Sequence, residues 1–237
     1  MGGESIWSRP AAGRRGPRPE FNRSEITAAA VDLADRNGLA AVSMRAVAGA
    51  LGTSAGSLYR YLNSRDELLA LMVDHALAGF APADPPADPA VDSPWLPAMV
   101  GLAHEQRALY RRHPWLLEAS MQVGSFGPRS MDYFERCLRI LSPLPNPAGE
   151  KLEAVAVLTG VVSLFARSGS AAANGPSAAA DPDGAVNPAA GFPPADPTAH
   201  PLLLAAFAAP ATPPRADLFD RAVRSVLVGL LTPHPAG

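Results

Sequence analysis

The sequence predicts an all-α protein made of two helical units. Apolar residues recur every three or four positions in one segment after another, and no segment alternates apolar and polar residues as a strand does. Capping residues precede several of these segments, and stretches rich in glycine or proline separate them. The stretch "APADPPADPAVDSP", which follows Phe80, contains too much proline for a helix interior and divides the two units.

The N-terminal unit contains four predicted helices. Asn22 and Glu25 have the spacing of a capping box at the start of the first helix, and Gly38 stands where a C-cap belongs. The second helix begins after Ser43 and stops at Gly52. The third, expected to be about seven residues long, begins after Thr53 or Ser54. The fourth covers residues 64–80, with Ser64 and Glu67 as a second capping box.

The C-terminal unit, residues 81–237, contains six predicted helices, and residues 168–200 interrupt them. That interval is low-complexity Ala/Pro/Gly sequence, which we expect to be largely disordered. Residues 1–19 are expected to be a disordered basic arm, and residues 20–66 a compact domain joined to the rest by the helix over 64–80. The six helices are expected over residues 95–112, 115–122, 130–141, 150–167, 201–209 and 215–231.

Charge is distributed unevenly along the chain. The net charge is −2, which argues against a wholly electrostatic nucleic-acid binder, yet residues 1–70 hold nine Arg against seven Asp and Glu. Cys137 is the only cysteine, so no intrachain disulfide can form and a reducing compartment is expected. Neither a signal peptide nor an apolar run of about 18–20 residues is present. A cytoplasmic protein with no membrane contact is expected.

The segment "GTSAGSLYRYLNSRDELL" has the spacing of a helix-turn-helix, whose third helix enters the major groove of DNA. Val42, Val47, Ala48, Leu51 and Leu58 are the apolar positions that pack the helices together. The side chains left on the outside carry hydroxyl and guanidinium groups, which donate to phosphate oxygens and base edges. These candidate DNA-binding residues are Ser43, Arg45, Thr53, Ser57, Tyr59, Arg60, Tyr61 and Arg65.

The stretch "AAAVDLADRNGLAAVSMRAVAGALGTSAGSLYRYLNSRDELLALMVD" resembles the DNA-binding segment of the tetracycline-repressor (TetR) family of bacterial transcriptional regulators. The resemblance covers residues 22–75. Beyond residue 90, "RALYRRHPWLLE" and "LFDRAVRSVLVGL" resemble the ligand-binding half of regulators close to the tetracycline repressor. Two features depart from the family: Ala55 and Gly56 at the start of the third helix offer no side-chain hydrogen bonds for base readout, and the interval 168–200 is longer and less ordered than usual. Arg65 also stands where the family usually has lysine.

The resemblance implies a homodimer that binds a palindromic operator in double-stranded DNA and responds to a small-molecule effector. Arg45 would touch the DNA backbone or a base edge, the third helix would face DNA, and Arg65 would clamp a phosphate. Read from the residues alone, alternatives stay open. Tyr59 either packs between helices or reads DNA, Tyr61 either packs against the fourth helix or reads DNA, and the arginines are either readers or solvated charges.

A second candidate site lies in the C-terminal unit. The helix "GLAHEQRALYRRHPW" has polar side chains that either form a wet face or project into an effector cavity with aromatic walls. The candidate effector-binding residues are Trp95, His104, Arg107, Tyr110, Trp115, Met121 and Phe134. No His, Cys, Asp or Glu spacing of a metal site and no nucleophile–base, P-loop or dinucleotide motif is found, so no metal, cofactor or enzymatic activity is expected.

Two long helices, over residues 150–167 and 215–231, are apolar on nearly every side. A helix of that kind must be covered all round, and in the family the corresponding pair forms a four-helix bundle with its two-fold mate. The candidate dimer residues are Val157, Val161, Leu164, Val223 and Leu227. The expected function is a ligand-responsive transcriptional regulator, most simply a repressor. The alternatives are a ligand-independent architectural DNA-binding protein and an all-helical enzyme with an accessory helix-turn-helix.

Overall fold

The computed structural model describes residues 6–8, 21–80, 95–123, 126–174, 196, 198–208 and 217–232. Within these residues the regular structure is entirely helical, which confirms the predicted all-α class. The α-helices are α1 (Arg23–Asn37), α2 (Met44–Ala50), α3 (Ala55–Leu58), α4 (Arg65–Ala76), α5 (Trp95–Arg112), α6 (Trp115–Gln122), α7 (Pro128–Ile140), α8 (Ala148–Asn174), α9 (Pro201–Ala208) and α10 (Leu218–Leu231). Two short 3-10 helices, η1 (Leu39–Ala41) and η2 (Leu77–Phe80), follow α1 and α4.

The helices of the N-terminal unit begin at the predicted caps. The Asn22 side chain accepts from the Glu25 N–H at 2.9 Å, and the Glu25 carboxylate accepts from the Asn22 N–H at 2.8 Å, which completes the capping box. Ser64 caps α4 through the Glu67 N–H at 3.1 Å. The Glu67 carboxylate, however, accepts from the N–H of Asn63 instead of that of Ser64, so the second capping box is displaced by one residue.

Several helix bounds differ from those expected. α3 is only four residues long, and the chain continues from it in a tighter turn, with the Tyr61 N–H donating to the Leu58 carbonyl. α7 begins two residues early at Pro128, which fits the first turn because its missing N–H is not needed there. α8 runs to Asn174, into the interval expected to be disordered. Its last turns are rich in alanine, the residue with the highest helix propensity.

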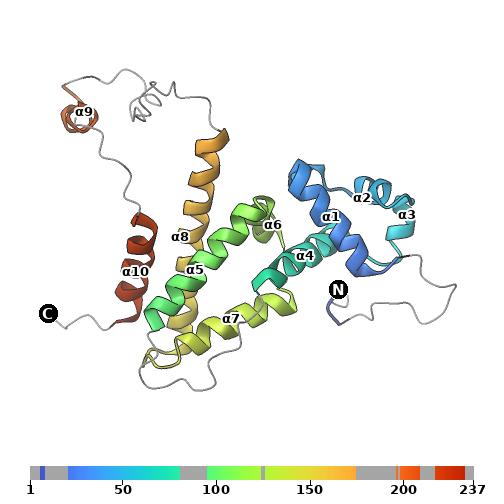
Figure 1. Ribbon diagram of the computed structural model, residues 1–237, viewed down its shortest axis with the longest axis horizontal. Helices are drawn as coiled ribbons and strands as arrows, with labels where there is room; N and C mark the ends of the chain where they lie inside the picture. Colours follow the sequence, from blue (N-terminus) through green and yellow to red (C-terminus); the bar gives the residue numbers. More distant parts are fainter. Residues whose placement is uncertain are drawn as a thin grey trace.

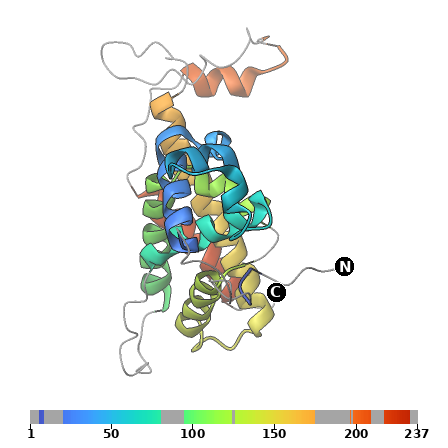
Figure 2. The ribbon, with the colours of Figure 1, turned by 90° about the vertical axis from the view of Figure 1, so that its right-hand side faces the viewer.

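α4 stands between the two units (Figure 1). On one side it packs against α1, whose neighbours α2 and α3 complete the N-terminal unit, and on the other against α6 and α7. The C-terminal unit is a bundle in which α8 lies beside both α5 and α10. α9 lies apart from this bundle in both views (Figures 1 and 2).

The basic arm expected over residues 1–19 is not free along its whole length. Ile6 is only 5% exposed and belongs to the hydrophobic core, and Trp7 packs against the same core. The arginines at positions 9, 14, 15 and 18 lie outside the described residues. The chain is therefore anchored at Ile6–Ser8, and twelve residues separate this segment from Phe21.

Candidate DNA-binding surface and effector site

The turn between α2 and α3 gives the N-terminal unit its shape. Gly52 has φ 69°, a left-handed conformation that favours glycine, and the Thr53 N–H returns to the Ala48 carbonyl at 2.9 Å. Ser54 then caps α3 by accepting from the Ser57 N–H at 3.2 Å. Leu58 is fully buried beneath the turn. The short α3 is therefore fixed against α2 in a helix-turn-helix arrangement.

Three candidate DNA-binding residues present large exposed side chains on this unit. Tyr59 is 52% exposed, and Arg45 and Arg60 are also exposed. Neither guanidinium pairs with any residue that the structure describes, which leaves both available to phosphates or bases. Ser43 is exposed as well, but its hydroxyl caps α2 through the Ala46 N–H at 3.1 Å. The exposure of Tyr59 favours contact of its side chain with DNA over packing between helices.

Other candidates have partners within the fold. The Tyr61 hydroxyl accepts from the Phe21 N–H at 3.4 Å, and the Tyr61 carbonyl accepts from Arg23 Nε at 3.1 Å, so Tyr61 fastens the start of α1. Arg65 Nε donates to the Val42 carbonyl at 3.2 Å and joins α4 to the loop before α2. Thr53 and Ser57 are half-buried, and the Ser57 hydroxyl bonds to that of Ser54 at 3.0 Å. These contacts give Tyr61 and Arg65 scaffolding roles.

A cavity of about 510 Å³ opens between α5, α6 and the second half of α8. Its volume is in the range of small-molecule sites, roughly 300–1,000 Å³. Two of the seven candidate effector-binding residues, Tyr110 and Met121, line it. The lining combines apolar and charged side chains: Tyr110, Arg111, Pro114, Leu117, Glu118, Met121, Ala166 and Arg167.

Trp115 lies beside this cavity but points away from it, toward the N-terminal unit. Its indole Nε1 donates to Asp35 of α1 at 2.6 Å, and His113 Nδ1 lies 2.7 Å from the same carboxylate oxygen. Trp115 is buried, whereas Asp35 keeps part of its surface in solvent. The side chains of Asp35, His113 and Trp115 form a latch between α1 and the corner where α5 meets α6. The sequence did not predict this contact, because Asp35 is nearly eighty residues away from the other two.

The remaining candidates have structural partners. His104 Nε2 bonds to Asp220 of α10 at 2.7 Å, and Arg107 lies over the Phe219 ring at 4.7 Å from its centroid. Both therefore join α5 to α10. Phe134 contacts Tyr133 edge-on, and Trp95 packs against the core from the first turn of α5. None of these four residues, nor Trp115, is among the lining residues of this cavity, so a role for the five in effector binding stays a prediction.

A buried polar cluster lies behind the cavity wall. Gln106 Nε2 donates to the Tyr110 hydroxyl at 3.1 Å and to Thr159 of α8 at 3.4 Å, while Tyr133 of α7 donates to Gln106 Oε1 at 3.3 Å. Burial raises the pKa of both tyrosines, that of Tyr133 well above its usual range, and raises the pKa of the neighbouring Cys137 thiol to about 12. These groups are neutral near pH 7, and their mutual hydrogen bonds allow their burial.

Signals for this cluster were present in the sequence. Gln106 and Tyr110 are four residues apart on one helix face, as are Thr159 and Ser163 on another. Only the three-dimensional crossing of α5, α7 and α8 shows that they meet.

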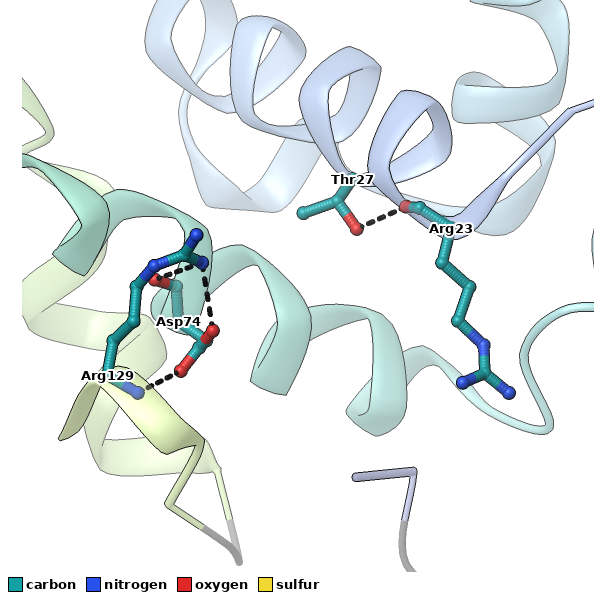
Figure 3. A network of polar contacts seen from close by, with 4 residues as sticks. All are labelled: Arg23, Thr27, Asp74 and Arg129. Atoms are coloured by element: carbon teal, nitrogen blue, oxygen red, sulfur yellow. Dashed lines mark hydrogen bonds and ion pairs between the residues drawn. The ribbon is translucent and has the colours of Figure 1, made fainter. Parts of the chain in front are cut away.

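A second connection between the units lies at the end of α4. The buried Asp74 carboxylate accepts from the Arg129 backbone N–H at 2.8 Å and from Arg129 Nη1 at 3.0 Å (Figure 3). Arg129 thus binds this carboxylate with both its backbone and its side chain. Arg129 Nη1 also reaches the Asp74 carbonyl at 3.4 Å. On α1, the buried Thr27 hydroxyl donates to the Arg23 carbonyl at 2.7 Å (Figure 3). The Asp74–Arg129 pair attaches α4 to the first turn of α7.

The candidate dimer residues divide into two groups. Val157 and Leu164 of α8 are 47% and 56% exposed, and Val161 between them is half-buried. Val223 and Leu227 of α10 are fully buried inside the subunit, so the expectation that they face a partner is corrected. α10 packs against α8 and α5, and its inner face is already covered. Its exposed large apolar residues are instead Leu218, Val228 and Leu230.

Two negative findings apply to the described residues only. No helix among them is both long and apolar enough to cross a membrane. Within the same part of the chain, no three His, Cys, Asp or Glu side chains are grouped so that they could hold a metal ion.

A helix-turn-helix with exposed basic and aromatic side chains, joined through one helix to a bundle with a small-molecule cavity, defines a class of protein: the two-domain bacterial regulators. Residues 26–72 match the family model described as bacterial regulatory proteins, tetR family, and residues 86–232 match the tetracyclin repressor-like C-terminal domain. The chain therefore belongs to the tetR family of bacterial regulatory proteins.

Curated relatives and solved structures agree with this family. The HTH-type transcriptional repressor DrrR1 of Streptomyces coeruleorubidus is 39% identical over 165 residues, which are 70% of this chain and 60% of that protein. An HTH-type transcriptional regulator of Saccharopolyspora erythraea is 29% identical over 127 residues, 54% of this chain and 51% of that one. The chain thus spans less than two thirds of either relative. The structure of ActR of Streptomyces coelicolor in complex with actinorhodin has a TM-score of 0.69 at 23% identity, covering 89% of this chain and 96% of ActR, and shows the shared fold.

Proposed function

We propose that the protein is a transcriptional repressor that binds an operator through its helix-turn-helix and leaves it when a small molecule occupies the cavity beside α6. The observation that carries this proposal is the direct connection between the two sites. Pro114 and Leu117 line the cavity, and Trp115, which follows Pro114 in the sequence and points away from the cavity, donates to Asp35 of the DNA-binding unit. A ligand that moves the start of α6 must therefore disturb the latch on α1.

The cavity indicates the character of the effector. Leu117, Met121 and Ala166 offer apolar surface, while Arg111, Glu118 and Arg167 add charge. We infer a mainly apolar molecule with polar substituents, somewhat less apolar than the sequence suggested. ActR, which shares the fold, has been solved with actinorhodin, so actinorhodin is a reasonable first compound to test.

Operator binding is expected to involve a dimer. α8 presents the exposed Val157 and Leu164 seven residues apart, with Val161 between them, so the three form one apolar stripe. A two-fold partner would cover this stripe and would place two helix-turn-helix units on one palindrome. BioQ, which shares the fold at a TM-score of 0.50, has been solved with its double-stranded DNA operator.

The proposal is tested by selecting DNA from random duplexes with the full chain. A palindromic sequence should be enriched, and at least one compound should weaken its binding in a gel-shift titration. By reciprocity, the same compound should bind more weakly when the operator is present. Failure to enrich any sequence would refute the regulator. Binding that no compound alters would favour the ligand-independent alternative.

The basic arm is expected to bind phosphates without reading sequence. Replacing Arg9, Arg14, Arg15 and Arg18 by serine should weaken binding to all duplexes about equally. Each lost phosphate contact should reduce the slope of log affinity against log salt by about 0.9. Substitution is a cleaner test than deletion of residues 1–18, which would also remove the packed Ile6 and Trp7. A salt slope equal to that of the wild type would show that the arm does not touch DNA.

Trp115→Phe is expected to weaken the latch. The substitution keeps an aromatic ring but removes the indole N–H that donates to Asp35. A hydrogen bond to a charged group contributes about 1.5–3 kcal/mol, and the partial exposure of Asp35 places this one near the lower end. Thermal unfolding should show the loss. Trp95→Phe makes the same change at an indole with no hydrogen bond to any described residue. The unfolding temperature of this variant should be closer to that of the wild type.

A further inference from the structure

The three described residues at the start of the chain dock between the two units. Ile6 is buried in the core, and its carbonyl oxygen accepts from Arg23 Nη1 of α1 at 3.4 Å. Trp7 is half-buried and packs against the core. Figure 1 shows this short blue segment near the N-terminus, below α4. The segment precedes the helix-turn-helix by more than a dozen residues, yet it lies against residues from both units.

Gly127 forms part of the seat for this segment. Its φ of −84° is open to any residue, so the need for glycine comes from space and not from backbone conformation. A Cβ added there would come within 2.8 Å of Trp7 Cη2 and would overlap the Asp74 carboxylate. The N-terminal segment, α4 and the first turn of α7 therefore converge on one glycine, next to the Asp74–Arg129 pair.

The segment also links elements that do not follow one another in the chain. Through Ile6 it is bonded to Arg23 at the start of α1, and through Trp7 it lies against Gly127 at the start of α7. A movement of the DNA-binding unit relative to the bundle must shift α1 relative to α7. Such a movement would have to break or stretch one of these contacts.

We propose that Ile6–Ser8 is a strap that restrains the movement of α1 and α4 against α7. Its regulatory consequence rests on the proposed function. A dimer binds two half-sites well only when its reading units hold the right spacing, and units that sample many spacings lose more conformational freedom on binding. The strap therefore favours operator binding without contacting DNA, and its role is separate from that proposed for the arginines at positions 9, 14, 15 and 18 of the basic arm.

Hydrogen exchange of the full chain tests the strap directly. Trp7→Ala removes the contact with Gly127 and is expected to speed amide exchange in the second half of α4 and the first turn of α7 by about threefold or more. Gly127→Ala disturbs the same contact from its other side but also displaces the Asp74 carboxylate, so its effect should be at least as large. α10 should exchange as in the wild type. Gly101→Ala is the matched control, because no atom lies within 4 Å of its added Cβ. Wild-type exchange in α4 and α7 of Trp7→Ala would overturn the strap, whatever Gly127→Ala shows.

Measurements of operator affinity test whether the strap favours DNA binding. The probes are a duplex selected from random sequence by the wild-type chain and a shortened duplex that keeps one half-site. Trp7→Ala is expected to weaken binding to the full duplex by about three- to tenfold while leaving the half-site affinity and the salt dependence unchanged. Equal losses on both duplexes would overturn the regulatory role. If the wild-type chain selects no DNA, the proposed function fails, and the exchange measurement still decides whether the strap exists.

Discussion

Arg60→Ala is expected to lower operator affinity by about ten- to a hundredfold, the effect of losing one well-placed guanidinium contact worth roughly 1–3 kcal/mol. Arg60 follows α3 on the outside of the helix-turn-helix, and its guanidinium pairs with no described residue. Since the Arg60 side chain makes no hydrogen bond or ion pair with a described residue, the variant should unfold at nearly the temperature of the wild type. A gel-shift titration at fixed salt measures the affinity.

Two control variants separate the loss of a DNA contact from the loss of a positive charge and from a loss of stability. Arg139→Ala removes the same charge from an exposed position on α7, where the arginine pairs only with the exposed Glu135, and should leave DNA binding unchanged. Tyr61→Phe removes a hydroxyl that accepts from the Phe21 N–H, so it should affect stability more than sequence preference. If Arg60→Ala binds like the wild type, α3 and the turn after it do not face the operator.

The sequence predicted well those features that depend on neighbouring residues. The capping box of Asn22 and Glu25 and the glycine turn at Gly52 are local, and the structure contains both. The small length of α3 was missed. Tyr61, three residues after α3 ends, is bonded to Phe21 and Arg23, contacts spanning about forty residues that no local signal reveals. Local signals therefore located the helix-turn-helix but did not distinguish its reading side chains from its scaffold.

The effector domain was less predictable, for a physical reason. Trp115, His104 and Arg107 were assigned to an effector cavity, but their partners Asp35, Asp220 and Phe219 are far away in the sequence. Periodicity places a side chain on a helix face but does not show which helix covers that face. For the same reason, the buried Val223 and Leu227 were wrongly predicted to lie on a dimer surface, because their helix face is covered within the subunit.

The most disruptive surface substitution is expected at Val157. Its side chain is 47% exposed on α8, in the apolar stripe with Val161 and Leu164, and is a better site than Val161, which is already half-buried within the subunit. A two-fold interface presents the same patch twice, so Val157→Glu would bring two carboxylates into one apolar contact. Burying such unpaired charges costs several kcal/mol.

We therefore expect Val157→Glu to give a folded, helical monomer that has lost tight operator binding, because a single reading unit retains only one half-site. Sedimentation and circular dichroism at matched concentrations measure the two properties separately. Met131→Glu is the control, since it makes a similar change at an exposed apolar residue of α7 and should leave the assembly intact. A stable Val157→Glu dimer would place the interface away from this stripe. An unfolded chain would show that the exposed face of α8 supports the subunit itself, and the dimer surface would then have to be sought on α10, at Leu218, Val228 and Leu230.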